Sequence, residues 1–213
     1  MQASLRTAAR LSRLCLAAAL LAACASLPPE GEEQAQREPL YLQRAALLQH
    51  VESWALEGRL AVSDDRDGGS GSFQWRNGAA DSRMDFHGAL GRGAWRLEAD
   101  ARGAELVFAD GTTHRAATVD ALVREQLGWR VPIEALDWWV RGLAAPGAVQ
   151  QRSLDPQGRL SDLQQDGWLI EYGRYGSVGD VTMPFRMTAR QDDRTVKIAV
   201  KKWRLSRQND PQD

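Results

Sequence analysis

The chain has 213 residues, and its 27 Lys and Arg nearly balance its 28 Asp and Glu, so the formal net charge at pH 7 is −1. A charge this close to zero argues against a nucleic-acid-binding protein, which would need a strongly basic surface. Both cysteines, Cys15 and Cys24, lie near the N-terminus, so the rest of the chain has no disulfide and depends on its apolar core.

The N-terminus has the pattern of a secretory signal. Arg6, Arg10 and Arg13 make a basic start, and an apolar run over residues 14–22 follows. The run is about half of the roughly 20 residues that a membrane-spanning helix needs. We therefore predict a signal peptide over residues 1–23. Removing its three arginines changes the charge to 24 minus 28, or −4.

The end of this signal, Leu21-Ala22-Ala23-Cys24, resembles the lipobox of bacterial lipoproteins. The resemblance implies that the thiol of Cys24 carries diacylglycerol and that the new amino group is acylated. Several acyl chains give a stable membrane anchor. The alternative is an ordinary secretory signal with a chance cysteine. The chain continues with Ala25-Ser26 and has no Asp next to Cys24. In enterobacterial lipoproteins an Asp at this position resembles a signal for retention in the inner membrane. The resemblance therefore implies the outer membrane, with the domain facing the periplasm.

The mature chain is expected to form one domain between two polar segments. Residues 24–39 are rich in Pro, Glu and Gln and are predicted to form a flexible tether. Residues 40–205 should form the domain, and residues 206–213 a disordered tail. Within the domain, the spacing of apolar residues over 40–51 predicts an amphipathic helix.

Most of the domain alternates apolar and polar residues with the period of two that is typical of half-buried strands. Turn sequences such as DDRDGG, RNGAAD and ADGT separate the segments. The last strand changes parity, which predicts a bulge near Lys201 and Lys202. The strands are expected near these residues: 54–62, 72–76, 83–87, 95–100, 106–108, 112–116, 160–163, 168–172, 185–189 and 195–205.

Two helices are predicted between these sets of strands. Thr118 is the expected N-cap of the first, which ends at Gly128. Pro132 opens the second, in which Leu136, Trp139, Val140 and Leu143 share one face. The sequence thus predicts a mostly β protein with inserted helices (α+β). Its core is an open, incomplete antiparallel β-barrel of about eleven strands covered by helices.

An apolar sheet face under helices is a candidate pocket for acyl chains, which need apolar area and no hydrogen bonds. The alternative is that the same aromatic residues form an ordinary core. The candidates for this cavity are the aromatic residues of the strands and the second helix: Trp54, Phe73, Trp75, Phe86, Trp95, Trp139, Trp168 and Trp203.

Residue patterns for catalysis or metal binding are weak. His50, His87 and His114 lie on different elements with no metal-ligand spacing, and no Ser lies in a nucleophile-elbow context. The glycine-rich segment 88–93 lacks the Lys-Ser/Thr ending of a phosphate-binding loop. We predict a non-enzymatic protein with no cofactor and no metal.

Several short motifs follow one another along the mature chain. They are Cys24, Trp54, Gly58-Arg59-Leu60, Phe73-Gln74-Trp75, Gly88-Ala89-Leu90-Gly91, Pro132, Leu136-Asp137-Trp138-Trp139-Val140-Arg141-Gly142-Leu143, Gly167-Trp168, Tyr172, Met183-Pro184 and Trp203. Their order and spacing together resemble the outer-membrane lipoprotein receptor LolB family. The resemblance covers essentially all of the mature chain.

The resemblance implies a monomeric carrier with the fold of the periplasmic chaperone LolA. Such a protein accepts the acyl chains of cargo lipoproteins from LolA and delivers them to outer-membrane phospholipid. It also implies that Leu90, flanked by Ala89 and Gly91, lies in a loop that inserts into the membrane. The family commonly has Pro where this chain has Ala89. The alternatives are that Leu90 folds back onto the sheet, and that the whole protein is an assembly lipoprotein that binds a partner protein.

Overall fold

The computed structural model describes residues 30–49, 51–65, 68–88 and 93–207. Contacts divide the chain into two units, residues 1–35 and residues 36–213, and the second contains the entire sheet. Eleven antiparallel strands form one sheet in the order β6-β5-β4-β3-β2-β1-β11-β10-β9-β8-β7. The sheet stays open, because β6 and β7 are edge strands that do not pair with each other. The predicted open sheet with covering helices is confirmed.

The two halves of the sheet are meanders in which neighbouring strands are also neighbours in sequence, joined where β1 pairs with β11. Their bounds are β1 (Val51–Ser63), β2 (Gly68–Asn77), β3 (Asp81–Gly88), β4 (Trp95–Asp100), β5 (Gly103–Phe108), β6 (Thr113–Ala116), β7 (Val149–Leu154), β8 (Leu160–Gln165), β9 (Trp168–Val178), β10 (Val181–Gln191) and β11 (Arg194–Arg207).

The alternation seen in the sequence becomes an inner, buried face and an outer, exposed face. In β2, for example, Phe73 and Trp75 are buried while Ser72, Gln74 and Arg76 are exposed. This pattern arises because successive side chains of a strand point to opposite faces.

The predicted bulge in the last strand is confirmed. Glu57 of β1 pairs with Lys202, but the next residue, Gly58, pairs with Val200, so Lys201 has no partner across the ladder. The bulge also explains the glycine. A Cβ atom at Gly58 would lie 2.3 Å from the carbonyl oxygen of Ala199, so no other residue fits without a backbone shift.

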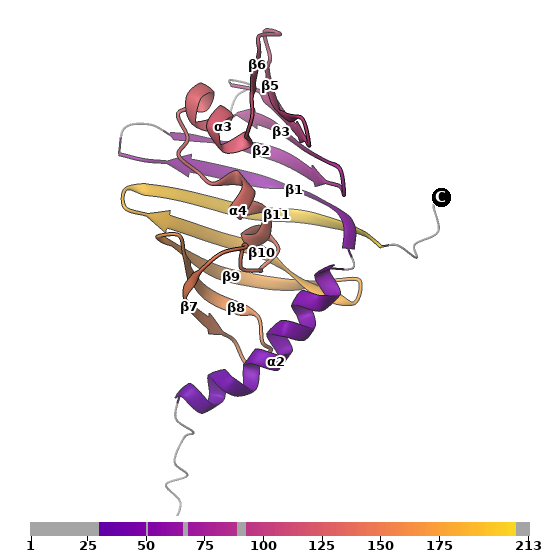
Figure 1. Cartoon of the computed structure of the whole chain (residues 1–213), viewed down its shortest axis with the longest axis vertical. Coiled ribbons are helices and arrows are strands. Elements are labelled where there is room, and N and C mark those ends of the chain that lie inside the picture. Colours follow the sequence, from indigo (N-terminus) through magenta and orange to yellow (C-terminus); the bar gives the residue numbers. More distant parts are fainter. Residues whose placement is uncertain (1–29, 50, 66–67, 89–92, 208–213) are drawn as a thin grey trace, which may run out of the picture. The chain divides into compact units, whose positions relative to one another are not determined.

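Helices α3 (Val119–Leu127) and α4 (Ile133–Val140) connect the two halves and lie over the sheet (Figure 1). The hydroxyl of Thr118 accepts a hydrogen bond from the N–H of Ala121, and Gly128 ends α3 with a left-handed φ of 70°. The predicted caps of α3 are therefore confirmed. Leu136, Trp139 and Val140 form the buried face of α4 as predicted. Leu143 is buried too, but it lies after the end of the helix at Val140.

The first helix is longer than the sequence predicts. Helix α2 spans Glu30–Gln49 and includes Pro39, so the prediction of a flexible tether is wrong for residues 30–39. Composition alone could not detect the contacts that hold this part of the helix. Arg37 donates a hydrogen bond to the carbonyl of Leu154, and Glu38 forms an ion pair with Arg152. Residues 1–29, with the predicted signal and Cys24, and residues 208–213 lie outside the described residues.

Among the helices of the described residues, none is both long and apolar enough to cross a membrane.

Candidate functional site

The inner face of the sheet carries a layer of aromatic side chains. All eight aromatic residues predicted as cavity candidates are buried, with exposed fractions of 6% or less. Trp54 is the centre of one group, because its ring lies edge-on to Trp75 at 5.1 Å and to Trp203 at 5.6 Å between centroids. Aromatic pairs favour this geometry, which fixes ring orientation beyond simple area burial.

A second aromatic group lies on β3 and β4, together with Trp129 of the connection between α3 and α4. Phe86 stacks on Trp95 at 5.0 Å, and both rings are met edge-on by Trp129, at 5.8 and 5.7 Å. Phe73 lies opposite Phe86 in the β2–β3 ladder and continues this group along the sheet.

The sequence reasoning missed Trp129. It follows the αL cap Gly128 and precedes α4, so it has no periodic position from which its burial could be inferred. A tryptophan directly after a helix-ending glycine was the only available signal.

A third group joins α4 to the second meander. The rings of Trp139 and Trp168 lie 6.1 Å apart, and the indole N–H of Trp139 donates a 3.0 Å hydrogen bond to Oε1 of Gln165. Gln165 is fully buried and also bonds Ala145 twice, accepting from its N–H and donating to its carbonyl. The structure therefore buries the eight predicted residues in three groups, seven of them on the strands and Trp139 on α4.

Polar contacts hold the C-terminal end of α4 in place. Tyr172 donates its hydroxyl to the carbonyl of Trp139 at 2.8 Å. Arg44 of α2, which is buried, donates to the carbonyls of Thr182, Gly142 and Arg141 at 3.0, 2.8 and 2.5 Å. Burial lowers the pKa of Arg44, and the tyrosines around it partly offset that effect. The C-terminal end of α4 is therefore held by hydrogen bonds from both α2 and the sheet.

The N-terminal end of α4 has a different support. Pro132 offers no side-chain cap, and Oδ1 of Asp120 in α3 instead accepts hydrogen bonds from the N–H groups of Ile133 and Glu134, at 2.7 and 3.4 Å. Burial raises the pKa of Asp120 despite these bonds. One carboxylate thus couples the two covering helices.

An ion pair on α4 lies beside the first aromatic group. Nε of Arg141 lies 3.3 Å from Oδ1 of Asp137, and the guanidinium lies over the rings of Trp138 and Trp54 at 4.7 and 6.0 Å. Burial raises the pKa of Asp137 and lowers that of Arg141. The pair therefore has a substantial desolvation cost.

Two hollows lie at opposite ends of the covered face. One, of about 510 Å³, is lined by the ends of β1 and β2 together with Leu127, Trp129 and Val131 of the α3–α4 connection. The other, of about 310 Å³, lies near Asn77, Val119 and Asp137. Between them the face is filled by the aromatic and aliphatic side chains of sheet and helices.

The other predicted site residues are those of the lipid anchor and of the membrane-insertion loop. Cys24 and the loop residues Ala89, Leu90 and Gly91 lie outside the described residues. Within the described ranges, no group of three or more His, Cys, Asp or Glu side chains has the arrangement of a metal site.

Comparison with known proteins identifies the family. A family model described as "Outer membrane lipoprotein LolB" matches residues 52–203. The chain belongs to the LolB family. An Outer-membrane lipoprotein LolB of Pseudomonas aeruginosa strain LESB58 is 39% identical over an alignment of 200 residues that covers 90% of this chain and 95% of that protein. An Outer-membrane lipoprotein LolB of Pseudomonas fluorescens strain Pf0-1 is 37% identical over an alignment of 190 residues that covers 87% of this chain and 91% of that one.

A solved structure supports the fold assignment for this LolB-family chain. An outer membrane lipoprotein-sorting domain from Vibrio parahaemolyticus, so described, is 7% identical and superposes with a TM-score of 0.51 over 81% of this chain and 93% of that one. At this identity the likeness concerns the fold. The family predicted from the motifs is thus confirmed by sequence relatives that span nearly the whole chain.

Proposed function

We propose that this protein accepts lipoproteins from the periplasmic chaperone LolA and inserts them into the inner leaflet of the outer membrane. The observation that carries the proposal is the layer of eight buried aromatic residues, seven on the strands of the sheet and Trp139 on α4. Flat aromatic rings offer large apolar area, which suits acyl chains that make no hydrogen bonds. No covalent step, metal or cofactor is needed for this role.

Transfer from pocket to pocket follows from the cost of exposing acyl chains. Each methylene in water costs about 0.8 kcal/mol, so a chain of ordinary length cannot cross the periplasm unprotected. An acceptor that binds the chains more tightly than the donor makes the transfer spontaneous. The protein then needs only an apolar face that can be opened and closed.

The aromatic face is filled in this structure, so binding requires the covering helices to move. We propose that acyl chains enter beside Trp129. The hollow of about 510 Å³ begins there, and the adjacent residues Leu127 and Trp129 are only partly buried. The other end of α4 is held by Arg44, Tyr172 and Gln165, and it would serve as the fixed end of the cover.

Membrane attachment completes the proposal. Cys24 would carry the lipid anchor that keeps a monomeric domain on the periplasmic face of the outer membrane, and Leu90 would enter the bilayer as cargo is released. Relatives named Outer-membrane lipoprotein LolB support this location. Replacing Cys24 with Ala should release the protein into the soluble periplasmic fraction, and retention in the membrane would refute the anchor.

The decisive experiment uses photo-crosslinking residues at Trp75 and Trp95 of the inner face. The matched controls are Gln74 and Arg96, their exposed neighbours on the outer face. With lipoprotein-loaded LolA, we expect the inner positions alone to label acyl chains or lipoprotein N-termini. Labelling of a folded partner protein, without acyl adducts, would instead support an assembly role and overturn the proposal.

A further inference from the structure

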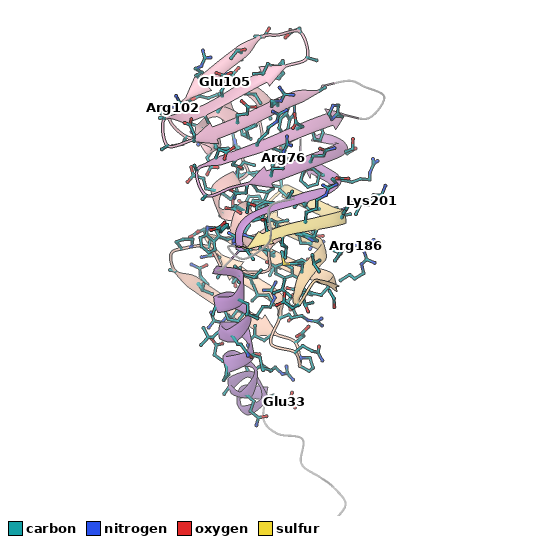
Figure 2. All side chains as sticks on the ribbon, turned by 90° about the vertical axis from the view of Figure 1, so that its right-hand side faces the viewer. Glu33, Arg76, Arg102, Glu105, Arg186 and Lys201 are labelled. Atoms are coloured by element: carbon teal, nitrogen blue, oxygen red, sulfur yellow. The ribbon has the colours of Figure 1, made fainter. Side chains whose placement is uncertain are left out.

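The outer face of the sheet carries a cluster of cations where β1, β11 and β10 meet. At its centre is Ala199, whose cross-strand neighbours are Arg59 of β1 and Arg186 of β10. Lys197 and Lys201 lie two residues before and after Ala199 on β11. All four cationic side chains are exposed. In Figure 2, Lys201 and Arg186 project from the same side of the molecule.

These cations have no acidic partners of their own. Among the described residues, none of the four forms an ion pair. The nearby carboxylates of Glu57 and Glu171 are instead paired with Arg204 and Arg190. The chain as a whole has a net charge of −1, so the cluster is a local excess of positive charge rather than a property of the composition.

The pairing of β9 with β10 places two positive charges opposite each other. Arg186 lies directly opposite Arg174 in the β9–β10 ladder, and like charges at such positions destabilise a sheet. Among the described residues, the favourable contact of Arg174 is with an aromatic ring, since its guanidinium lies 4.9 Å from the centroid of Phe185. A bound anion would relieve repulsion that the fold itself leaves in place.

The surface is also hollowed beside this cluster. A depression of about 470 Å³ is lined by Arg59, Lys201 and Ala199, with the polar side chains of Ser72, Gln74 and His87 on β2 and β3. Glu57 also lines it, but its carboxylate is paired with Arg204. Because the side chain of Ala199 is small, it leaves the centre of the depression open. The cations and polar groups around it offer hydrogen-bond donors. Such a hollow suits the phosphate of a lipid headgroup, because cationic donors make the strong, charge-assisted bonds that phosphate oxygens accept.

We infer that this basic face, defined as Arg59, Arg174, Arg186, Lys197 and Lys201, binds anionic phospholipid headgroups at the membrane surface. A membrane is the favoured partner because the relatives are outer-membrane lipoproteins, so a bilayer is always near, and cation clusters are attracted to anionic lipid. The inference concerns the outer face and does not depend on acyl chains binding the inner face.

The test measures co-sedimentation of the full chain carrying Cys24→Ala, so that no lipid anchor contributes. The vesicles contain phosphatidylcholine alone, or two parts phosphatidylcholine to one part phosphatidylglycerol. At about 0.1 M salt, where screening acts over about 10 Å, we expect at least roughly tenfold tighter binding to the anionic vesicles. The triple variant Arg59→Gln, Lys197→Gln, Lys201→Gln should lose most of this preference, and salt near 1 M should abolish it.

The matched control is Arg102→Gln, Arg115→Gln, Arg124→Gln, which removes the same charge from exposed positions elsewhere. This variant should keep the preference for anionic vesicles. Equal losses in both variants, or binding that ignores phosphatidylglycerol, would overturn the inference. Loss of crosslinking to an acidic protein in the first variant, with vesicle binding unchanged, would assign the face to a protein partner instead.

Discussion

Trp139 and Gln165 form a hydrogen-bonded pair in which neither side chain is exposed to solvent, with 3.0 Å between Nε1 and Oε1. The pair joins α4 to β8. Because Gln165 also bonds both backbone groups of Ala145, one amide satisfies three buried polar groups at the end of the covering helix. A buried amide of this kind fixes where the helix ends against the sheet.

Replacing Gln165 with Leu should therefore destabilise the protein although the volume is nearly conserved. The indole N–H of Trp139 and the backbone groups of Ala145 would stay buried without partners, at a cost of about 3 kcal/mol in the free energy of unfolding. Urea unfolding measures the change. Gln164→Leu, at the exposed neighbouring position, is the control and should change stability little. Equal effects of the two variants would show that the network contributes nothing.

Arg44 should hold α2 against the rest of the domain. Arg44→Met leaves the carbonyls of Arg141, Gly142 and Thr182 without their donor, and we expect a loss of about 3 kcal/mol in the free energy of unfolding. Arg44→Lys should recover only part of it, since an ammonium lacks the planar fork.

Hydrogen exchange should locate the effect of Arg44→Met in α2 and in the segment after α4. Gln43→Met, one residue earlier and exposed, is the matched control. A loss of protection spread uniformly over the sheet would contradict this local role.

The raised pKa of Asp137 predicts how the stability of the protein depends on pH. Burial raises its pKa above the ordinary value of 3.8, so the folded protein keeps this proton at a higher pH than the unfolded chain does. The corresponding contribution to stability is present below the unfolded pKa and is lost as pH rises through the folded pKa. The unfolding free energy of the wild type, minus that of Asp137→Asn, should fall as the pH rises over the range above about 4, the ordinary pKa of this carboxyl. A difference that grows over this range would contradict the assignment.

Trp129 should control access to the aromatic face. Trp129→Ala removes the edge contacts with Phe86 and Trp95 and enlarges the hollow beside them. We expect a fluorescent fatty acid to bind faster, and the free energy of unfolding to fall by about 2 kcal/mol because Trp129 is only partly buried. Trp138→Ala, a partly buried tryptophan of α4, is the control and should leave the binding rate unchanged. An equal increase in both variants would indicate general loosening.

Leu90 should act after cargo has been accepted. Leu90→Glu places a charge at the tip of the proposed insertion loop, and a charged group enters the apolar part of a bilayer only at high cost. The variant should still take lipoproteins from LolA but should deliver few of them to liposomes. Leu90→Met keeps an apolar tip and should retain delivery. Normal delivery by Leu90→Glu would refute the insertion role.

Several local features followed from residue patterns because they depend on neighbouring positions alone. The alternation of Phe73 and Trp75 with polar residues predicted the inner face, and the change of parity predicted the bulge at Lys201. The caps at Thr118 and Gly128 were also predictable, since a cap acts within one helical turn. The start of α2 could not be predicted in this way, because residues 30–39 are polar. The contacts that hold them, such as the hydrogen bond from Arg37 to Leu154, join positions far apart in the chain.

The sequence by itself determined the strand periodicity, the family and most of the aromatic residues that are buried between the sheet and α4. Only the tertiary structure decided how these residues meet. Pairing of β1 with β11 places Trp54 beside Trp203, and the α3–α4 connection places Trp129 over Phe86. The same pairing surrounds Ala199 with cations that lie far apart in the chain. The physical reason is that periodicity records which face a side chain occupies, whereas its neighbours across strands depend on register, which long-range packing sets.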